Sequence, residues 1–224
     1  FMANKSTIQT ISFFDKEEDV LAEKNSSHAE KGPWDVSYNN DGSVMAWQIG
    51  NDVYVVGNGK GYIYMPAKAS NWFSSMTSLV SINGMDIIDT SKATDMGSMF
   101  YQCNALENVD VSHFDTSNVK YMTNMFSFCR ALTDLDVSNF NTTNVTYMNS
   151  MFSWCSSLTS LNLGNIDTSN ATTFNCMFNG CSSLPKIDVS SFNTSKVTDM
   201  EGMFSSCSSL AEIDVSNFDT SHVT

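Results

Sequence analysis

The sequence predicts an α/β solenoid of stacked 26-residue strand–turn–helix repeats, with a small antiparallel β cap at its N-terminus. Three observations lead to this fold class. Cysteine, phenylalanine and leucine each recur at a step of 26 residues, turn residues divide each step into two apolar segments, and the pattern is different before residue 71. Repeats of this size stack because one copy cannot bury its own apolar face.

The repeats cover residues 71–224, as six copies and part of a seventh. Three columns of residues keep the period: Cys103, Cys129, Cys155, Cys181 and Cys207; Phe100, Phe126, Phe152, Phe178 and Phe204; and Leu106, Leu132, Leu158, Leu184 and Leu210. A degenerate copy with one extra residue precedes them. We therefore predict three parts, which are an acidic N-terminal extension at 1–31, a β-rich cap at 32–70 and the repeats at 71–224.

Each repeat is expected to hold one strand, one turn and one short helix. In the copy from 132 to 155, the segment LTDLDVS alternates apolar and polar residues, as a half-buried strand does. The segment NTTN that follows Phe140 contains residues that favour turns and helix caps. After it, apolar residues recur at steps of three and four, which indicates an amphipathic helix. They are Val145, Met148, Met151, Phe152 and Cys155.

The repeated segments resemble a known family. LTDLDVS and its copies LENVDVS, LTSLNLG, LPKIDVS and LAEIDVS look like the strand of leucine-rich repeats. With FDTSNV and the Met-Phe-Cys segment attached, the unit resembles the BspA-like leucine-rich repeat proteins of bacterial surfaces, over about two thirds of the chain. Phe140 departs from the asparagine that many such repeats have there. The resemblance implies a leucine-rich-repeat horseshoe with an adhesive or protein-binding role at the cell surface or in secreted form.

The overall charge narrows the class of partner. The 224 residues carry a formal net charge of −13 and only 11 lysines and arginines. Binding to nucleic acid or to acidic lipid needs positive charge, so both partners are disfavoured. No apolar run is long enough for a membrane-spanning helix, and no signal peptide is visible. The chain reads as a fragment of a longer protein, so missing targeting signals carry little weight.

The five periodic cysteines are predicted to be free, buried packing residues. Equivalent side chains in stacked repeats point the same way, whereas a disulfide needs its Cβ atoms about 3.5–4.5 Å apart. Five identical nucleophiles would serve no reaction, and no cysteine pair has the spacing of a zinc site. We expect no catalytic residue, no metal site and no cofactor.

Four segments before the repeats are expected to be strands, which are WDVS (34–37), SVMAWQI (43–49), DVYVV (52–56) and GYIYM (61–65). The connections between them contain Asp-Gly and Asn-Gly turns, which favour hairpins. A solenoid needs such a cap over its first layer. Residues 15–24 are expected to form a short acidic helix.

Two columns of acidic and amide residues follow the repeat. The first lies on the strand face: Asp110, Asp136, Asn162, Asp188 and Asp214. It is either a solvated polar face or a docking surface for a cationic partner or Ca²⁺. The second lies in the turns: Asp89, Asp115, Asn141, Asp167, Asn193 and Asp219. Its side chains are expected to bind nearby backbone N–H groups and to start the helices.

Two adjacent copies carry aromatic residues that the repeat does not require. Tyr121 and Phe128 lie on one predicted helix, and Tyr147 and Trp154 lie on the next. Other copies have small or polar residues there. These four residues either fill the groove between neighbouring helices or form an exposed interface.

The leading functional hypothesis is a surface-displayed, non-catalytic repeat domain that binds an extracellular or host protein, or a glycan. The alternative is a structural spacer that displays another module, and an enzyme is a remote third reading. End-to-end self-association of the chain is also expected, because its last repeat is incomplete.

Overall fold

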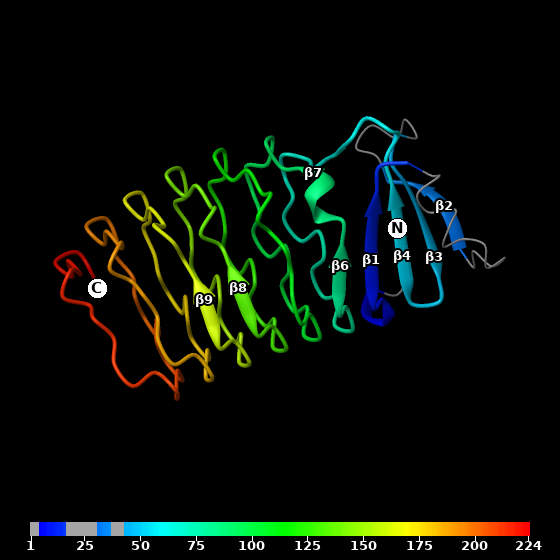
Figure 1. Ribbon diagram of the computed structural model, residues 1–224. Coiled ribbons are helices and arrows are strands. Elements are labelled where there is room, and N and C mark those ends of the chain that lie inside the picture. Colours follow the sequence, from blue (N-terminus) through cyan, green and yellow to red (C-terminus); the bar gives the residue numbers. More distant parts are fainter. Residues whose placement is uncertain (1–4, 17–30, 37–42) are drawn as a thin grey trace.

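The computed structural model describes residues 5–16, 31–36 and 43–224. The chain forms an elongated stack of coils, with the strand-rich N-terminal part at one end and the C-terminus at the other (Figure 1). The elements are β1 (Thr10–Phe14), β2 (Lys31–Asp35), β3 (Met45–Ile49), β4 (Asp52–Val56), β5 (Ile63–Tyr64), β6 (Ser81–Asn83), β7 (Ile88–Asp89), β8 (Asp134–Asp136) and β9 (Ser160–Asn162), with 3-10 turns η1 (Lys5–Thr7) and η2 (Met85–Ile87).

The N-terminal sheet has the strand order β2-β3-β4-β1-β6 and joins the cap to the first coil. Strands β2, β3 and β4 are antiparallel, but β1 runs parallel to both β4 and β6. Three of the four strands expected before the repeats thus pair antiparallel as expected, but the sheet as a whole is mixed, and β5, in the fourth expected segment, pairs in parallel with β7 in a separate sheet. Strand β1 also lies in the segment expected to be an acidic extension. Most of the acidic helix expected at 15–24 falls outside the described residues.

Parallel contacts link each coil to the next at the period of the sequence. Isolated bridges connect Lys68, Asp95, Tyr121, Tyr147, Thr173 and Asp199 in succession. A column of phenylalanine rings runs through the interior. The ring centroids of Phe100 and Phe126 are 5.2 Å apart, and those of Phe126 and Phe152 are 6.0 Å apart, with nearly parallel planes. All three side chains are fully buried. Equivalent side chains thus pack against their own copies.

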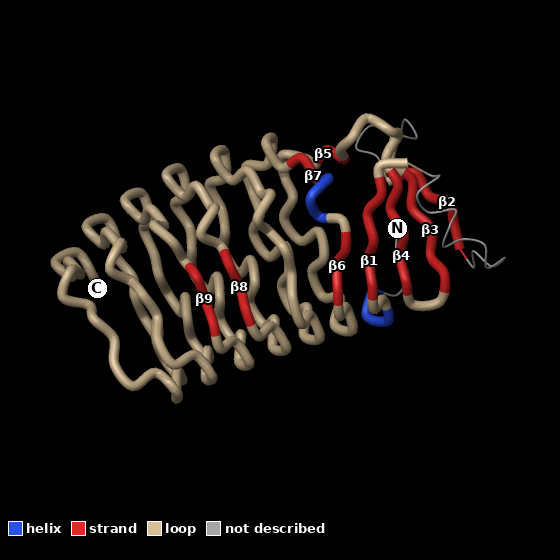
Figure 2. Tube along the Cα trace, in the orientation of Figure 1, coloured by secondary structure: helices blue, strands red, loops and turns tan. Residues whose placement is uncertain are grey.

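The predicted helices are wrong, and with them the α/β solenoid and the leucine-rich-repeat horseshoe. The described residues contain no α-helix, and loops and turns make up most of each coil (Figure 2). In the segment expected to be helical, the N–H groups of Met122 and Phe126 donate to the carbonyls of Tyr147 and Met151 in the next coil, both at 2.9 Å. A helix would need these donors for its own carbonyls.

The remaining N–H groups of this segment close tight turns. The Met125 N–H donates to the Met122 carbonyl at 3.2 Å, and the Cys129 N–H donates to the Phe126 carbonyl at 3.1 Å. Asn124 and Phe128 have φ values of 57° and 63°. A positive φ at the third position is what a type II turn requires, and it interrupts a right-handed helix. Each such segment is therefore a pair of stacked turns.

Buried threonines form a second set of hydrogen bonds between neighbouring coils. Thr168 is 1% exposed, and its hydroxyl donates to the Asn193 carbonyl at 2.9 Å and accepts the Asn193 N–H at 2.7 Å. The same position is buried in the other coils: Thr90, Thr116, Thr142 and Thr194. The turn column beside it binds local backbone as expected. For example, Asp115 Oδ1 accepts the Ser117 N–H at 2.9 Å, but no helix starts there.

Candidate functional site

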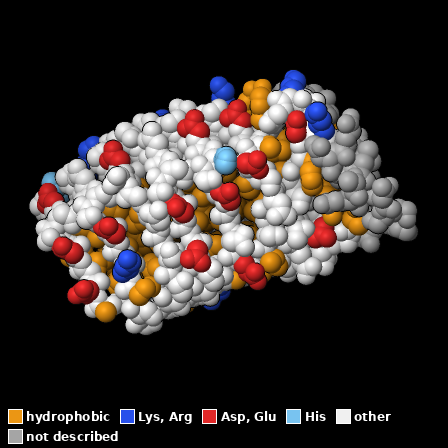
Figure 3. All heavy atoms as spheres, viewed as in Figure 1, with side chains coloured by type: hydrophobic (Ala, Val, Ile, Leu, Met, Phe, Trp, Pro, Cys, Tyr) orange, Lys and Arg blue, Asp and Glu red, His pale blue; other side chains and the backbone are white. Residues whose placement is uncertain are grey.

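The column predicted on the strand face is engaged in local turns. Asp110, Asp136, Asp188 and Asp214 each accept the N–H of the serine two residues later, at 2.8–3.0 Å. Asn162 makes the equivalent contact to Gly164 and also donates to Asp136 Oδ2 at 3.0 Å. All five side chains are exposed. Acidic side chains are scattered over the face seen in Figure 3, with hydrophobic atoms visible between them.

Hydrogen bonds hold these carboxylates in the charged form. The pKa of Asp110, Asp136, Asp188 and Asp214 is lowered, first by the serine hydroxyl and then by the serine N–H. These bonds explain why an aspartate or asparagine recurs at this position. Among the described residues, no group of three or more histidine, cysteine, aspartate or glutamate side chains could hold a metal ion.

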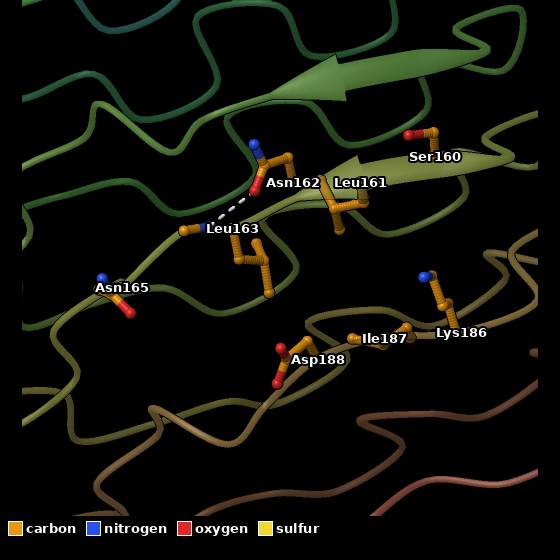
Figure 4. Close-up of a pocket in the computed structure, with 9 residues that line it drawn as sticks. Ser160, Leu161, Asn162, Leu163, Asn165, Lys186, Ile187 and Asp188 are labelled. Atoms are coloured by element: carbon orange, nitrogen blue, oxygen red, sulfur yellow. Dashed lines mark hydrogen bonds between the residues drawn. The ribbon is translucent and has the colours of Figure 1, made fainter.

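A hollow of about 660 Å³ opens on the strand face between β9 and residues 186–188 (Figure 4). Strand β9 pairs with β8 on its other side. The lining combines the apolar Leu161, Leu163 and Ile187 with the oppositely charged Lys186 and Asp188. Because the two charges oppose one another, the hollow has no marked preference for an anion or a cation.

The periodic cysteines are free, as expected, and each thiol donates to a backbone carbonyl of the preceding coil. Cys129 Sγ lies 3.2 Å from the Phe100 carbonyl, and Cys155 Sγ lies 3.2 Å from the Phe126 carbonyl. Burial raises the pKa of Cys155 to about 12. A neutral, buried thiol is a poor nucleophile, so these residues serve to hydrogen-bond one coil to the next and to fill the interior of the coils. Cys207, in the last coil, is only partly buried.

The four predicted aromatic residues form two stacks. Tyr121 and Tyr147 have ring centroids 5.4 Å apart with planes 7° from parallel, and Phe128 and Trp154 have centroids 6.2 Å apart with planes 5° from parallel. Tyr121 is 45% exposed, Tyr147 42% and Trp154 38%, whereas Phe128 is partly buried. The rings thus pack face to face along the stack and present their edges to solvent.

The second stack occupies a backbone position where large side chains are unusual. Phe128 and Trp154 have φ values of 63° and 60°. Left-handed backbone is strained for bulky residues, and such strain concentrates at functional sites. The equivalent position in other coils holds Gln102, Gly180 and Ser206. The stack of coils therefore does not require an aromatic residue there.

Glycine in the next coil makes room for the indole. A Cβ added to Gly180 would lie 2.9 Å from Trp154 Cδ2, which is too close for a real contact. The Trp154 ring is thus held between the Phe128 ring on one side and the Gly180 backbone on the other. Tyr101 extends the group, since its ring meets Phe128 edge to face at 5.8 Å.

The repeat pattern does not point to Arg130, although it is the only arginine of the chain. Its Cζ lies 5.2 Å from the Phe128 ring centroid and 5.4 Å from the Trp154 ring centroid. Both distances are typical of cation–π contacts. The side chain is exposed. We name Tyr101, Phe128, Arg130 and Trp154 the aromatic–arginine cluster. A lone arginine two residues after Phe128 was the available signal.

Comparison with known proteins gives a family and no function. A family model described as "Mycoplasma protein of unknown function, DUF285" matches residues 67–184 and, in a second match, residues 155–224. Neither a curated protein nor a solved structure matches the chain. The expected identity as a BspA-like leucine-rich repeat protein is therefore wrong, because the matching family is a different one and the coils lack helices. The labels leucine-rich repeat and adhesion lose their basis with it.

Proposed function

The chain belongs to the family described as Mycoplasma protein of unknown function, DUF285, and from its own geometry we propose that it is a non-catalytic, protein-binding domain. One observation carries the proposal. Two adjacent coils display Tyr121, Tyr147 and Trp154 at the surface, at positions where the stack needs no large side chain. Tryptophan, tyrosine and arginine are the residues most enriched in the energetic centres of protein interfaces.

The orientation of the rings favours a protein over a glycan as partner. Sugars bind proteins by lying on open aromatic faces, whereas each ring in the two stacks has one face covered by its partner ring, and the Gly180 backbone covers the other face of Trp154. The exposed edges and the guanidinium instead suit the mixed apolar and polar surface of a protein. A spacer that binds nothing is the second candidate function. It gains support from the regular column of turns, in which most polar groups bond within the stack.

The test compares capture of extracellular proteins by the immobilised chain and by the double variant Tyr147→Ala with Trp154→Ala. The control double variant is Thr173→Ala with Ser206→Ala, which changes the same two positions in later coils. We expect the aromatic variant to lose the captured protein, the control to keep it, and both to melt within about 3 °C of the wild type. Equal capture by all three proteins, or capture of nothing, contradicts the proposal and favours the spacer.

Two further expectations stay predictions. The expectation of cell-surface display or secretion came from the resemblance to BspA-like leucine-rich repeat proteins, which the fold contradicts. The described residues contain no helix that is long and apolar enough to cross a membrane. End-to-end self-association would use the last coil, where Val215 is 41% exposed and Phe204 is only partly buried.

A further inference from the structure

The first of the two coils that carry the aromatic stacks also departs from the repeat in its charges. The position before Tyr121 holds a threonine in the other coils, such as Thr94 and Thr172, whose hydroxyls donate to a carbonyl of the preceding coil. Lys120 replaces it in this coil. The position of Arg130 holds Ser182 and Ser208 in later coils. Both serines donate to a carbonyl one coil back, at 3.2 Å.

These changes add two positive charges to an otherwise acidic molecule. Lys120 and Arg130 are the only lysine or arginine between residues 93 and 185. Residues 116–133 contain no aspartate or glutamate, and residues 137–166 contain no charged side chain at all. The chain as a whole carries a net charge of −13. The aromatic residues thus lie in a stretch of sequence whose positive charges are Lys120 and Arg130, although Asp95 lies beside Tyr121 in the preceding coil.

Arg130 is exposed and has no charged partner among the described residues. Within the part of the chain that the structure describes, the Arg130 side chain contacts the Phe128 and Trp154 rings and makes neither a hydrogen bond nor an ion pair. A cation–π contact leaves the N–H donors of the planar guanidinium fork available for hydrogen bonds. That planar fork matches a carboxylate, which accepts two parallel hydrogen bonds.

We propose that the aromatic–arginine cluster binds a carboxylate of an acidic partner segment, with apolar side chains of that segment against the exposed edges of Trp154 and Tyr147. This inference rests on the proposed function, because it names the chemistry of the protein that the surface binds. Lys120 adds positive charge beside the Tyr121–Tyr147 stack and speeds the approach of an acidic segment. The cluster thus gives geometric specificity, while Lys120 acts at longer range.

The experiment uses the full chain and a seven-residue peptide of alternating Glu and Leu, with the Gln-Leu peptide as the uncharged comparison. Because the chain has one arginine, the Arg130 Nε–H group gives a single assignable NMR resonance. We expect the acidic peptide to shift this resonance and that of the Trp154 indole N–H. The uncharged peptide should leave both in place, and added salt should weaken binding.

A matched pair of variants separates local recognition from net charge. Arg130→Gln and Lys186→Gln remove the same charge, and Lys186 lies on the strand face. We expect Arg130→Gln to weaken binding of the acidic peptide about 10-fold or more, and Lys186→Gln to weaken it less than 2-fold. An unshifted Arg130 resonance, equal binding of the uncharged peptide, or equal losses in both variants overturns the inference. The proposed function survives that result if protein capture still depends on Tyr147 and Trp154.

Discussion

At the scale of single residues, the recurring aspartates cap local turns. Asp115 accepts the Ser117 N–H at 2.9 Å, and its pKa is lowered below the usual 3.8 by the Ser117 hydroxyl and N–H. Asn141 and Asn193 hold the same position in other coils and make the same contact with their side-chain oxygens. The cap therefore requires an acceptor oxygen at this position but does not require a negative charge.

The depressed pKa values predict instability in acid. A carboxylate with a lowered folded-state pKa contributes stability that is fully present above the unfolded-state pKa and is lost as the pH falls through the folded value. We expect the melting temperature to fall as the pH drops below about 4, the ordinary range of an aspartate pKa, and through the lower folded-state values. Asp115→Asn should keep the melting temperature near neutral pH within about 2 °C and make the fall in acid smaller.

The acid melt of Asp115→Asn is compared with that of wild type by circular dichroism at several pH values. An identical fall in both proteins would show that the charge of Asp115 contributes nothing to the acid sensitivity.

At the scale of elements, the sequence predicts the stacking period but not the conformation within it. Met122, Met125, Phe126 and Cys129 have apolar spacings of three, one and three. An amphipathic helix produces these spacings, and so does a pair of four-residue turns, because 3.6 and 4 cannot be told apart over eight residues. The left-handed backbone of Asn124 and Phe128 decides in favour of the turns. Sequence propensity does not mark both of these residues as turn residues.

The buried threonines were missed for a related reason. Within FDTSNV, the threonine reads as one more polar turn residue, yet Thr168 is 1% exposed and pairs with both backbone groups of Asn193. Burial of a hydroxyl is visible only once the neighbouring coil is in place. The sequence alone thus shows clearly which positions repeat, but it shows less clearly which of those positions face inward.

Thr168 gives a direct test of cross-linking between coils. Thr168→Val keeps the side-chain shape but leaves the Asn193 N–H and carbonyl without their partner, which should lower the free energy of unfolding by about 2–4 kcal/mol. Thr168→Ser keeps the hydroxyl and should cost about 1 kcal/mol or less. Urea unfolding of both variants measures the difference. Equal losses would mean that Thr168 contributes by packing and not by its hydrogen bonds.

At the scale of the whole molecule, a uniform scaffold carries one locally distinct surface. The buried columns hold the coils together along their full length, while Lys120, Tyr121, Phe128, Arg130 and the residues of the next coil depart from the repeat. The exposed aromatic residues could be found from the sequence because they break a strict pattern. The role proposed for Arg130 depends on its contacts with the Phe128 and Trp154 rings. The predicted helix would have placed these rings differently.

The central claim is that Trp154 serves the surface and not the fold, and urea unfolding of Trp154→Gly beside Phe152→Ala tests it most directly. Glycine relieves the left-handed backbone at position 154 and offsets the lost ring contact, so the free energy of unfolding should change by less than about 1 kcal/mol. Phe152→Ala empties a fully buried site and should cost about 3–5 kcal/mol. A loss for Trp154→Gly as large as that for Phe152→Ala would contradict the claim.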